Sequence, residues 1–122
     1  MKKKITIYSC SGCSNLAQLA NSIAVKIHRD KMATMSCIAG VGGDVVSLVN
    51  VAKDAEKIIA LDGCSLACVQ NCLNRHNIIP DTHVILTDLK LKKSIIAEAS
   101  SLEFDIAYDY VLEKLNKMKG DS

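Results

Sequence analysis

Aromatic side chains are scarce in this chain of 122 residues, which has no tryptophan, three tyrosines and one phenylalanine. Proteins that bind single strands of nucleic acid stack bases on spaced aromatic rings, and four scattered rings do not make such a platform. Arginine is also scarce, with only Arg29 and Arg75, and the formal net charge is +2. Because phosphate binding requires a strongly basic surface, we expect no nucleic-acid partner.

Long apolar runs are missing as well. No run approaches the roughly 18 residues that span a membrane, so we expect no membrane partner. Near the start, the stretch Ile5–Tyr8 reaches the polar Ser9 after four residues. A secretion signal needs an apolar stretch of about 7 to 15 residues. The sequence therefore predicts a cytoplasmic protein.

The overall composition is that of a folded protein. Hydrophobic residues make up 49% of the chain and charged residues 23%. This balance excludes an intrinsically disordered protein, because enough apolar surface is available to build a core. The length is typical of one domain, so we expect residues 1–122 to form a single α/β domain.

Short β-branched runs alternate with amphipathic stretches along the chain. Strands are predicted at residues 4–9, 33–39, 57–61 and 83–87. Helices are predicted at about 14–29 with Ser14 as the N-cap, and at 45–55, 66–74 and 103–119. This alternation predicts a three-layer, Rossmann-like or flavodoxin-like domain with a mostly parallel sheet of four or slightly more strands. The segment 89–102 shows no assignable pattern.

Cysteine, by contrast, is abundant, with six residues: Cys10, Cys13, Cys37, Cys64, Cys68 and Cys72. Stable disulfides are rare in a reducing cytoplasm, so metal binding or thiol chemistry explains these residues better. Ligands of an open parallel sheet bind beyond the carboxyl ends of its strands. The first five cysteines all lie near the end of a predicted strand or just after one. We therefore expect separate loops to bring these thiols to one edge of the sheet.

The spacing of the later cysteines suits a zinc site only in part. Zinc–sulfur distances are ~2.3 Å in a tetrahedral site, and the i, i+4 spacing of Cys64 and Cys68 allows both sulfurs to reach one ion. With Ser65 as the expected N-cap, Cys68 falls in a first helical turn, where the helix dipole stabilises negative charge. Cys72 lies a further turn along the helix, so we expect it to face the core.

Other polar residues carry weaker signals. Asp62 directly precedes Gly63, and Asp-Gly is typical of the turn that ends a strand, so we interpret Asp62 as turn chemistry rather than as a base. We expect the three histidines, His28, His76 and His83, to have solvent-facing or capping roles. Of these, His28 and His83 are predicted to lie toward the amino edge of the sheet.

Several motifs together resemble the DGC-domain family, a group of small bacterial and archaeal proteins whose proposed activity is zinc binding. The resemblance covers about residues 4–93 and rests on Cys10-Ser11-Gly12, Cys37-Ile38-Ala39-Gly40, Asp62-Gly63-Cys64 with Ala67-Cys68, and Leu86-Thr87-Asp88-Leu89. It implies a zinc site formed by Cys10, Cys37, Cys64 and Cys68. Cys13 departs from the family pattern and is a possible additional thiol.

The resulting expectation is a small cytoplasmic zinc-binding protein whose thiolate site, at the carboxyl edge of the sheet, has a structural or metal-handling role. Two alternatives stay open. One is a thiol-based redox protein or cysteine-nucleophile enzyme, with Cys10 or Cys68 as nucleophile and Cys13 as the resolving thiol. The other is an iron–sulfur carrier, because thiolates bind both metals. Whether the chain is an enzyme stays open.

Overall fold

Four parallel strands lie at the centre of the computed structural model, which describes residues 4–120; Met1–Lys3 and residues 121–122 lie outside the described residues. The strands are β1 (Ile5–Ser9), β2 (Thr34–Met35), β3 (Lys57–Asp62) and β4 (Thr82–Ile85). Their spatial order is β2-β1-β3-β4, and every neighbouring pair is parallel. This order is that of the flavodoxin-like sheet, so the predicted fold class is confirmed.

The two central strands carry most of the sheet. β1 and β3 pair along their length, from Ile5 opposite Lys57 to Ser9 opposite Leu61. In both strands almost every residue is buried, because helices cover both faces. A continuous apolar run such as the one in β3 is typical of a strand in this position. The edge strands β2 and β4 are shorter and only partly buried.

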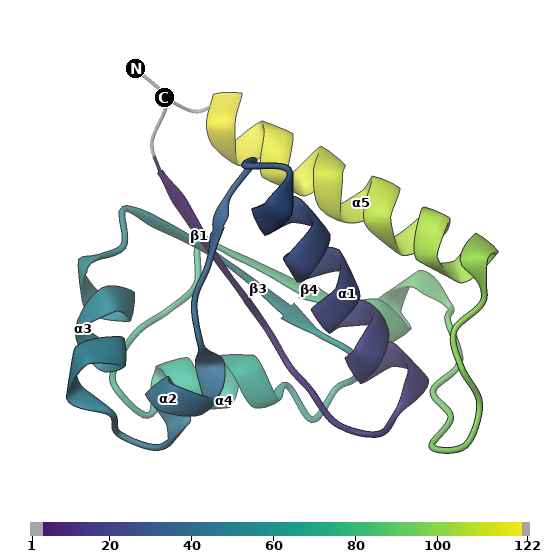
Figure 1. Cartoon of the computed structure of the whole chain (residues 1–122), viewed down its shortest axis with the longest axis horizontal. Helices are drawn as coiled ribbons and strands as arrows, with labels where there is room; N and C mark the ends of the chain where they lie inside the picture. The colour runs from purple at the N-terminus through teal and green to yellow at the C-terminus, as the bar shows by residue number, and fades with distance from the viewer. Residues whose placement is uncertain (1–3, 121–122) are drawn as a thin grey trace.

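Helices form the outer two layers (Figure 1). Their bounds are α1 (Asn15–Arg29), α2 (Ile38–Gly42), α3 (Val46–Asp54), α4 (Cys68–Asn74) and α5 (Ser101–Gly120), with a 3₁₀ turn η1 at Leu86–Leu89. α1 and α5 pack together on one face of the sheet, and α2, α3 and α4 lie together on the other. No helix within residues 4–120 combines the length and the apolar character needed to cross a bilayer.

Helix α1 follows its sequence pattern closely. The Ser14 hydroxyl accepts a hydrogen bond from the Ala17 N–H at 3.1 Å, so Ser14 is the N-cap that the sequence predicts. The inward face is fully buried at Leu16, Ile23 and Ile27. Each such side chain contributes about 1.5–3 kcal/mol through burial. The apolar stripe of α1 therefore holds the helix against the sheet.

The predicted second strand, 33–39, is wrong in its second half. The last hydrogen bond to β1 joins the Ser36 N–H to the Ile7 carbonyl at 3.2 Å. Cys37 then becomes the N-cap of α2, with its Sγ accepting from the Gly40 N–H at 3.4 Å. Capping a helix thus replaces strand pairing, and Cys37 leaves the sheet.

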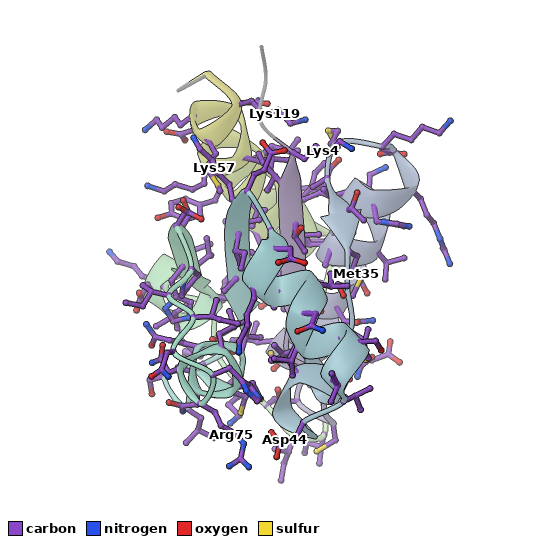
Figure 2. The ribbon with its side chains drawn as sticks, turned by 90° about the vertical axis from the view of Figure 1, so that its left-hand side faces the viewer. Lys4, Met35, Asp44, Lys57, Arg75 and Lys119 are labelled. Atoms are coloured by element: carbon purple, nitrogen blue, oxygen red, sulfur yellow. The ribbon has the colours of Figure 1, made fainter. Side chains whose placement is uncertain are left out.

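Three other element boundaries differ from those predicted from the sequence. The predicted strand 83–87 turns into η1 at Leu86, and the predicted helix 66–74 begins only at Cys68. The unassigned segment is an irregular connection over residues 90–100, and α5 starts two residues earlier than the predicted 103. Figure 2 shows Lys4, Lys57 and Lys119 together at one end of the molecule and the ion pair of Arg75 with Asp44 at the other.

Gly63, directly after β3, lies in contact with the backbone of α1. A Cβ atom at this position would come within 2.8 Å of the Ala17 nitrogen and the Leu16 carbonyl carbon. Any larger residue would have to push α1 away from the sheet. The absence of a side chain at Gly63 therefore lets the turn after β3 lie against the first turn of α1.

We predict that Gly63→Ala lowers the free energy of unfolding by about 1–3 kcal/mol, the usual cost of overpacking. Gly120→Ala is the matched control, because a Cβ at Gly120 meets no atom within 4 Å. Urea unfolding of both variants provides the measurement. Equal stabilities for the two variants would show that the contact between Gly63 and α1 has no energetic weight.

Candidate thiol site

The strand order reverses between β1 and β3, and this is where the thiols meet. The chain leaves β1 toward β2 and leaves β3 toward β4, on opposite sides, so a crevice opens between the carboxyl ends of β1 and β3. Cys10 follows β1, and its N–H bonds to the Leu61 carbonyl at 3.0 Å. Cys64 follows β3 after Asp62-Gly63. Two cysteines distant in sequence therefore emerge side by side.

A cleft of about 180 Å³ lies at this point, and four cysteines line it: Cys10, Cys13, Cys64 and Cys68. We call it the thiol cleft. Its wall also contains Ala17, Leu66, Lys93 and Ile95. Two of the four cysteines come from the connection after β1 and two from the connection after β3. The expectation that separate loops bring thiols to one edge is thus met for these four residues.

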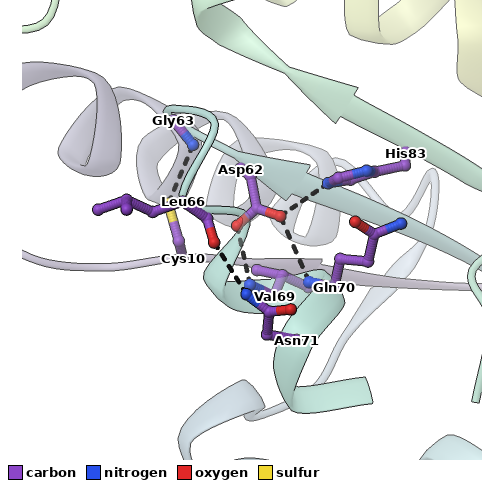
Figure 3. Close-up of polar contacts among 8 residues, drawn as sticks. All are labelled: Cys10, Asp62, Gly63, Leu66, Val69, Gln70, Asn71 and His83. Carbon is purple, nitrogen blue, oxygen red and sulfur yellow. Dashed lines mark hydrogen bonds and ion pairs between the residues drawn. The ribbon is translucent and has the colours of Figure 1, made fainter. Parts of the chain in front are cut away.

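Cys10 is the innermost of the four thiols. Its side chain is only 8% exposed, and its Sγ accepts a hydrogen bond from the Gly63 N–H at 3.2 Å (Figure 3). Burial raises the pKa of the Cys10 thiol to about 11, and the Gly63 N–H opposes this shift. Asp62, Cys68 and Cys64 add a smaller upward effect, because any negative charge on these neighbours disfavours a charge on Cys10. Cys10 is therefore a neutral thiol at pH 7 in the metal-free protein.

The other three thiols of the cleft are more open to solvent. Cys13 and Cys68 are exposed and Cys64 is half-buried, and none of the six cysteines, all of which lie within residues 4–120, forms a disulfide. The Lys93 ammonium donates a hydrogen bond to the Cys64 Sγ at 3.3 Å. The cleft thus combines one buried thiol, three accessible ones and one cation.

The segment that carries Lys93 is attached to the start of α1 by Asn15, which is 6% exposed. Asn15 donates from Nδ2 to the Lys92 carbonyl at 2.9 Å and accepts at Oδ1 from the Ser94 N–H at 2.7 Å. Its own N–H donates to the Ser94 carbonyl at 2.9 Å. Sequence reasoning missed Lys93, because residues 90–100 form no periodic element and the attachment is made almost 80 residues away in the chain.

Asp62 lies beneath the cleft and organises α4 (Figure 3). Its carboxylate is 1% exposed and accepts from the Val69 N–H at 2.8 Å and from the Gln70 N–H at 3.3 Å. The expected N-cap Ser65 is wrong: Ala67 occupies that position, in a left-handed conformation and without a side-chain cap bond. Asp62 therefore satisfies the first N–H groups of α4 from the neighbouring strand.

His83 supplies the third partner of Asp62. Its Nε2 lies 2.7 Å from Oδ2 of Asp62, and its side chain is only 16% exposed. The expectation of a solvent-facing or capping histidine at the amino edge is therefore wrong for His83. Ala60 of β3 pairs with His83 of β4, and the imidazole reaches along the sheet to the carboxylate two residues further on. The sequence does not indicate this contact, because His83 and Asp62 lie on different strands and are not paired directly across the sheet.

The other two histidines have structural contacts. His28 is exposed, as expected for a solvent-facing side chain, and its Nδ1 accepts from the Met35 N–H at 2.9 Å, which links the end of α1 to β2. His76 lies with Nε2 2.8 Å from the Val41 carbonyl and 3.1 Å from Asp44. Both imidazoles connect neighbouring segments of backbone and do not line the thiol cleft.

Cys37 and Cys72 lie outside the lining of the thiol cleft. Cys37 is exposed at the start of α2, near the fully buried Tyr8. Burial raises the pKa of Tyr8, and the neighbouring Ser36 side chain opposes this shift. Cys72 packs on Gly42, where a Cβ would approach its sulfur to 2.8 Å. Cys72 thus contacts α2, and burial raises the pKa of its thiol.

The thiols share a cleft without forming a ready coordination shell. Within the part of the chain that the structure describes, no three His, Cys, Asp or Glu side chains are placed to hold one metal ion. Of the expected zinc ligands, Cys10, Cys64 and Cys68 come together, and Cys37 stands apart from the cleft. Cys13, expected only as an additional thiol, lines the cleft with the first three.

Comparison with known proteins adds a family and a relative. The family model described as DGC domain matches residues 6–111. The chain is also similar to the Anaerobic and virulence modulator AnvM of Pseudomonas aeruginosa, with 55% identity over 87 residues. This match covers 71% of the chain and 66% of the relative, slightly less than two thirds of that protein's length. No solved structure matches the chain.

We predict that Cys10 makes the stability of the metal-free protein depend on alkaline pH. Its folded pKa of about 11 exceeds that of an unfolded thiol, so its contribution is present below about pH 9 and is lost as pH rises toward 11. The loss amounts to about 2 kcal/mol. Urea unfolding at pH 8–11 should show a shallower decline in Cys10→Ala than in the wild type. Cys13→Ala should keep the wild-type slope, and a Cys10→Ala slope equal to both would contradict the assignment.

A second prediction concerns the cap that Asp62 provides. Asp62→Ala should lower the free energy of unfolding by about 2 kcal/mol, because two N–H groups of α4 lose their acceptor. Asp54→Ala, at an exposed position in the last turn of α3, serves as the control. If guanidinium unfolding gives both variants the same midpoint, the carboxylate of Asp62 does not hold α4.

Proposed function

The chain belongs to the DGC-domain family, and we propose that it is a zinc-binding α/β module whose metal is held by thiolates in the thiol cleft. The observation that carries the proposal is the convergence of four cysteines, from two separate connections, on a single cleft at the switch point of the sheet. Thiolates are the preferred ligands of structural zinc. The donor chemistry of the cleft therefore suits this metal.

Three residues form the centre of the proposed site: Cys10, Cys64 and Cys68. They belong to the ligand set that the family resemblance implies, and all three line the cleft. The fourth ligand has two candidates. The resemblance favours Cys37, whereas the lining of the cleft favours Cys13. Substituting each residue separately distinguishes these two ligand sets.

Zinc binding in this cleft requires rearrangement and loss of protons. The thiols are not placed as a coordination group, and Cys10 is protonated at neutral pH. Metal binding would therefore release protons and weaken as the pH falls. Four thiolates around a divalent ion carry a net charge of −2, and the Lys93 ammonium beside Cys64 offsets part of it.

The role that follows is structural or metal-handling. A closed shell of four sulfurs leaves no position for water or substrate, so hydrolysis at the metal is disfavoured. The proposed location is the reducing cytoplasm, where thiols stay free for metal binding. The proposal includes no nucleic-acid partner, because the net charge is only +2 with two arginines, and no membrane partner, because long apolar runs are missing.

A second candidate function is thiol-based redox chemistry. Two observations favour it: the thiols are free rather than gathered around one point, and an ammonium group contacts the sulfur of Cys64. The relative from Pseudomonas aeruginosa is named an anaerobic and virulence modulator. Oxidation of thiols in the cleft is a chemistry through which such a protein would respond to oxygen.

Metal analysis tests the proposal directly. Protein purified without chelator should contain about one zinc per chain, and Cys64→Ser and Cys68→Ser should each lose it. Cys72→Ser is the matched control and should keep the metal, because Cys72 contacts α2 outside the cleft. Whichever of Cys13→Ser and Cys37→Ser loses zinc identifies the fourth ligand.

The same preparations separate the alternatives. A brown colour with visible absorption after anaerobic purification would indicate that the same thiolates bind an iron–sulfur cluster in place of zinc. Absence of metal together with two rapidly alkylated thiols would support redox chemistry instead. Unchanged zinc in Cys64→Ser would contradict the thiol cleft as the binding site. Circular dichroism of each variant shows whether the fold is retained.

A further inference from the structure

A second cavity lies next to the thiol cleft, between the first half of α1 and the start of α5. Its volume is about 390 Å³, and we call it the side cavity. Its lining comprises Asn15, Gln18, Leu19, Ser22, residues 97–101 and Phe104, together with Cys13. Cavities that bind small molecules span about 300–1,000 Å³. The side cavity is therefore large enough for a compound of a few carbon atoms.

Cys13 lines both cavities. Hydrogen bonds hold the loop on each side of this residue: the Gln18 Nε2 donates to the Gly12 carbonyl at 2.7 Å, and Ser14 caps α1. The thiol of Cys13 is exposed. A fixed, accessible thiol thus lies where a molecule in the side cavity would reach it.

The charge of the side cavity is negative. Among the described residues that line it, Glu98 is the one ionised side chain, and the others are hydroxyl, amide, thiol or apolar groups. At the start of α5, the Glu103 carboxylate accepts from the Ser100 N–H at 2.9 Å, which places a second negative charge beside the positive end of the helix dipole. Lys93 lines the thiol cleft instead, where it contacts Cys64. The side cavity therefore favours a cationic ligand.

We propose that the side cavity binds small disulfides that carry an amine, and that Cys13 exchanges with them. The Cys13 thiol gives its proton to solvent, and its sulfur attacks one sulfur of the bound disulfide. The disulfide bond of the ligand breaks as the new bond to Cys13 forms. The departing thiolate takes up a proton, so one disulfide replaces another without a further oxidant. This inference applies to the metal-free protein and does not depend on zinc binding.

Cystamine and dithiodiglycolate provide the test, because both are small symmetric disulfides and carry opposite charges. Reduced, chelator-treated protein is mixed with each compound at low ionic strength, and adducts are located by mass spectrometry of peptides. We expect cystamine to modify Cys13 before the other cysteines. Its rate should exceed that of dithiodiglycolate by about fivefold, as expected from one nearby negative charge, that of Glu98. Added salt should reduce the difference.

Variants make the result specific. Glu98→Gln should reduce the preference for cystamine without changing the site of modification, and Cys13→Ser should abolish the fast adduct. Cys72→Ser is the control and should react like the wild type. Fast modification of Cys13→Ser, equal rates for the two compounds, or an unchanged preference in Glu98→Gln would each overturn the proposal. Zinc content is measured on the same samples before chelation, so failure of the zinc proposal is distinguished from failure of this one.

Discussion

The parallel pairing of β1 with β3 is the constraint on which the site depends. Five consecutive residue pairs, from Ile5 and Lys57 to Ser9 and Leu61, hold the two strands in register. Cys10 and the Gly63-Cys64 turn follow directly, and the hydrogen bond from the Gly63 N–H to the Cys10 Sγ spans the crevice. Because the strand order reverses at this pair, the connections that follow β1 and β3 diverge and leave a crevice between them. The buried strands thus fix the backbone positions from which the thiols extend.

Around this pair, a small number of buried polar groups joins separate connections. Asp62 links the end of β3 to α4 and to His83 of β4. Asn15 links the start of α1 to residues 92–94, which brings Lys93 to Cys64. Each group is almost fully buried and has its hydrogen bonds satisfied, so moving either one would leave polar atoms unpaired. These two buried groups therefore hold the connections on either side of the cleft in place.

The sequence was sufficient for the elements whose patterns are local. Three local features predict the structure correctly: the cap at Ser14, the apolar stripe of α1 and the continuous apolar run of β3. Each depends only on residues within its own segment. Features that depend on contacts between segments were missed. Cys37 caps a helix instead of extending a strand, His83 bonds a carboxylate on the adjacent strand, and Lys93 is placed by Asn15. None of these contacts produces a periodic pattern of residues in the sequence.

The structure therefore describes thiols that are near one another but not yet arranged around a metal, and the central claim is that zinc gathers those of the cleft. Zinc K-edge X-ray absorption on protein loaded with one equivalent of the metal tests this claim most directly. The account predicts a first shell composed of sulfur at about 2.3 Å. A first shell dominated by nitrogen and oxygen at about 2.0–2.1 Å would contradict it.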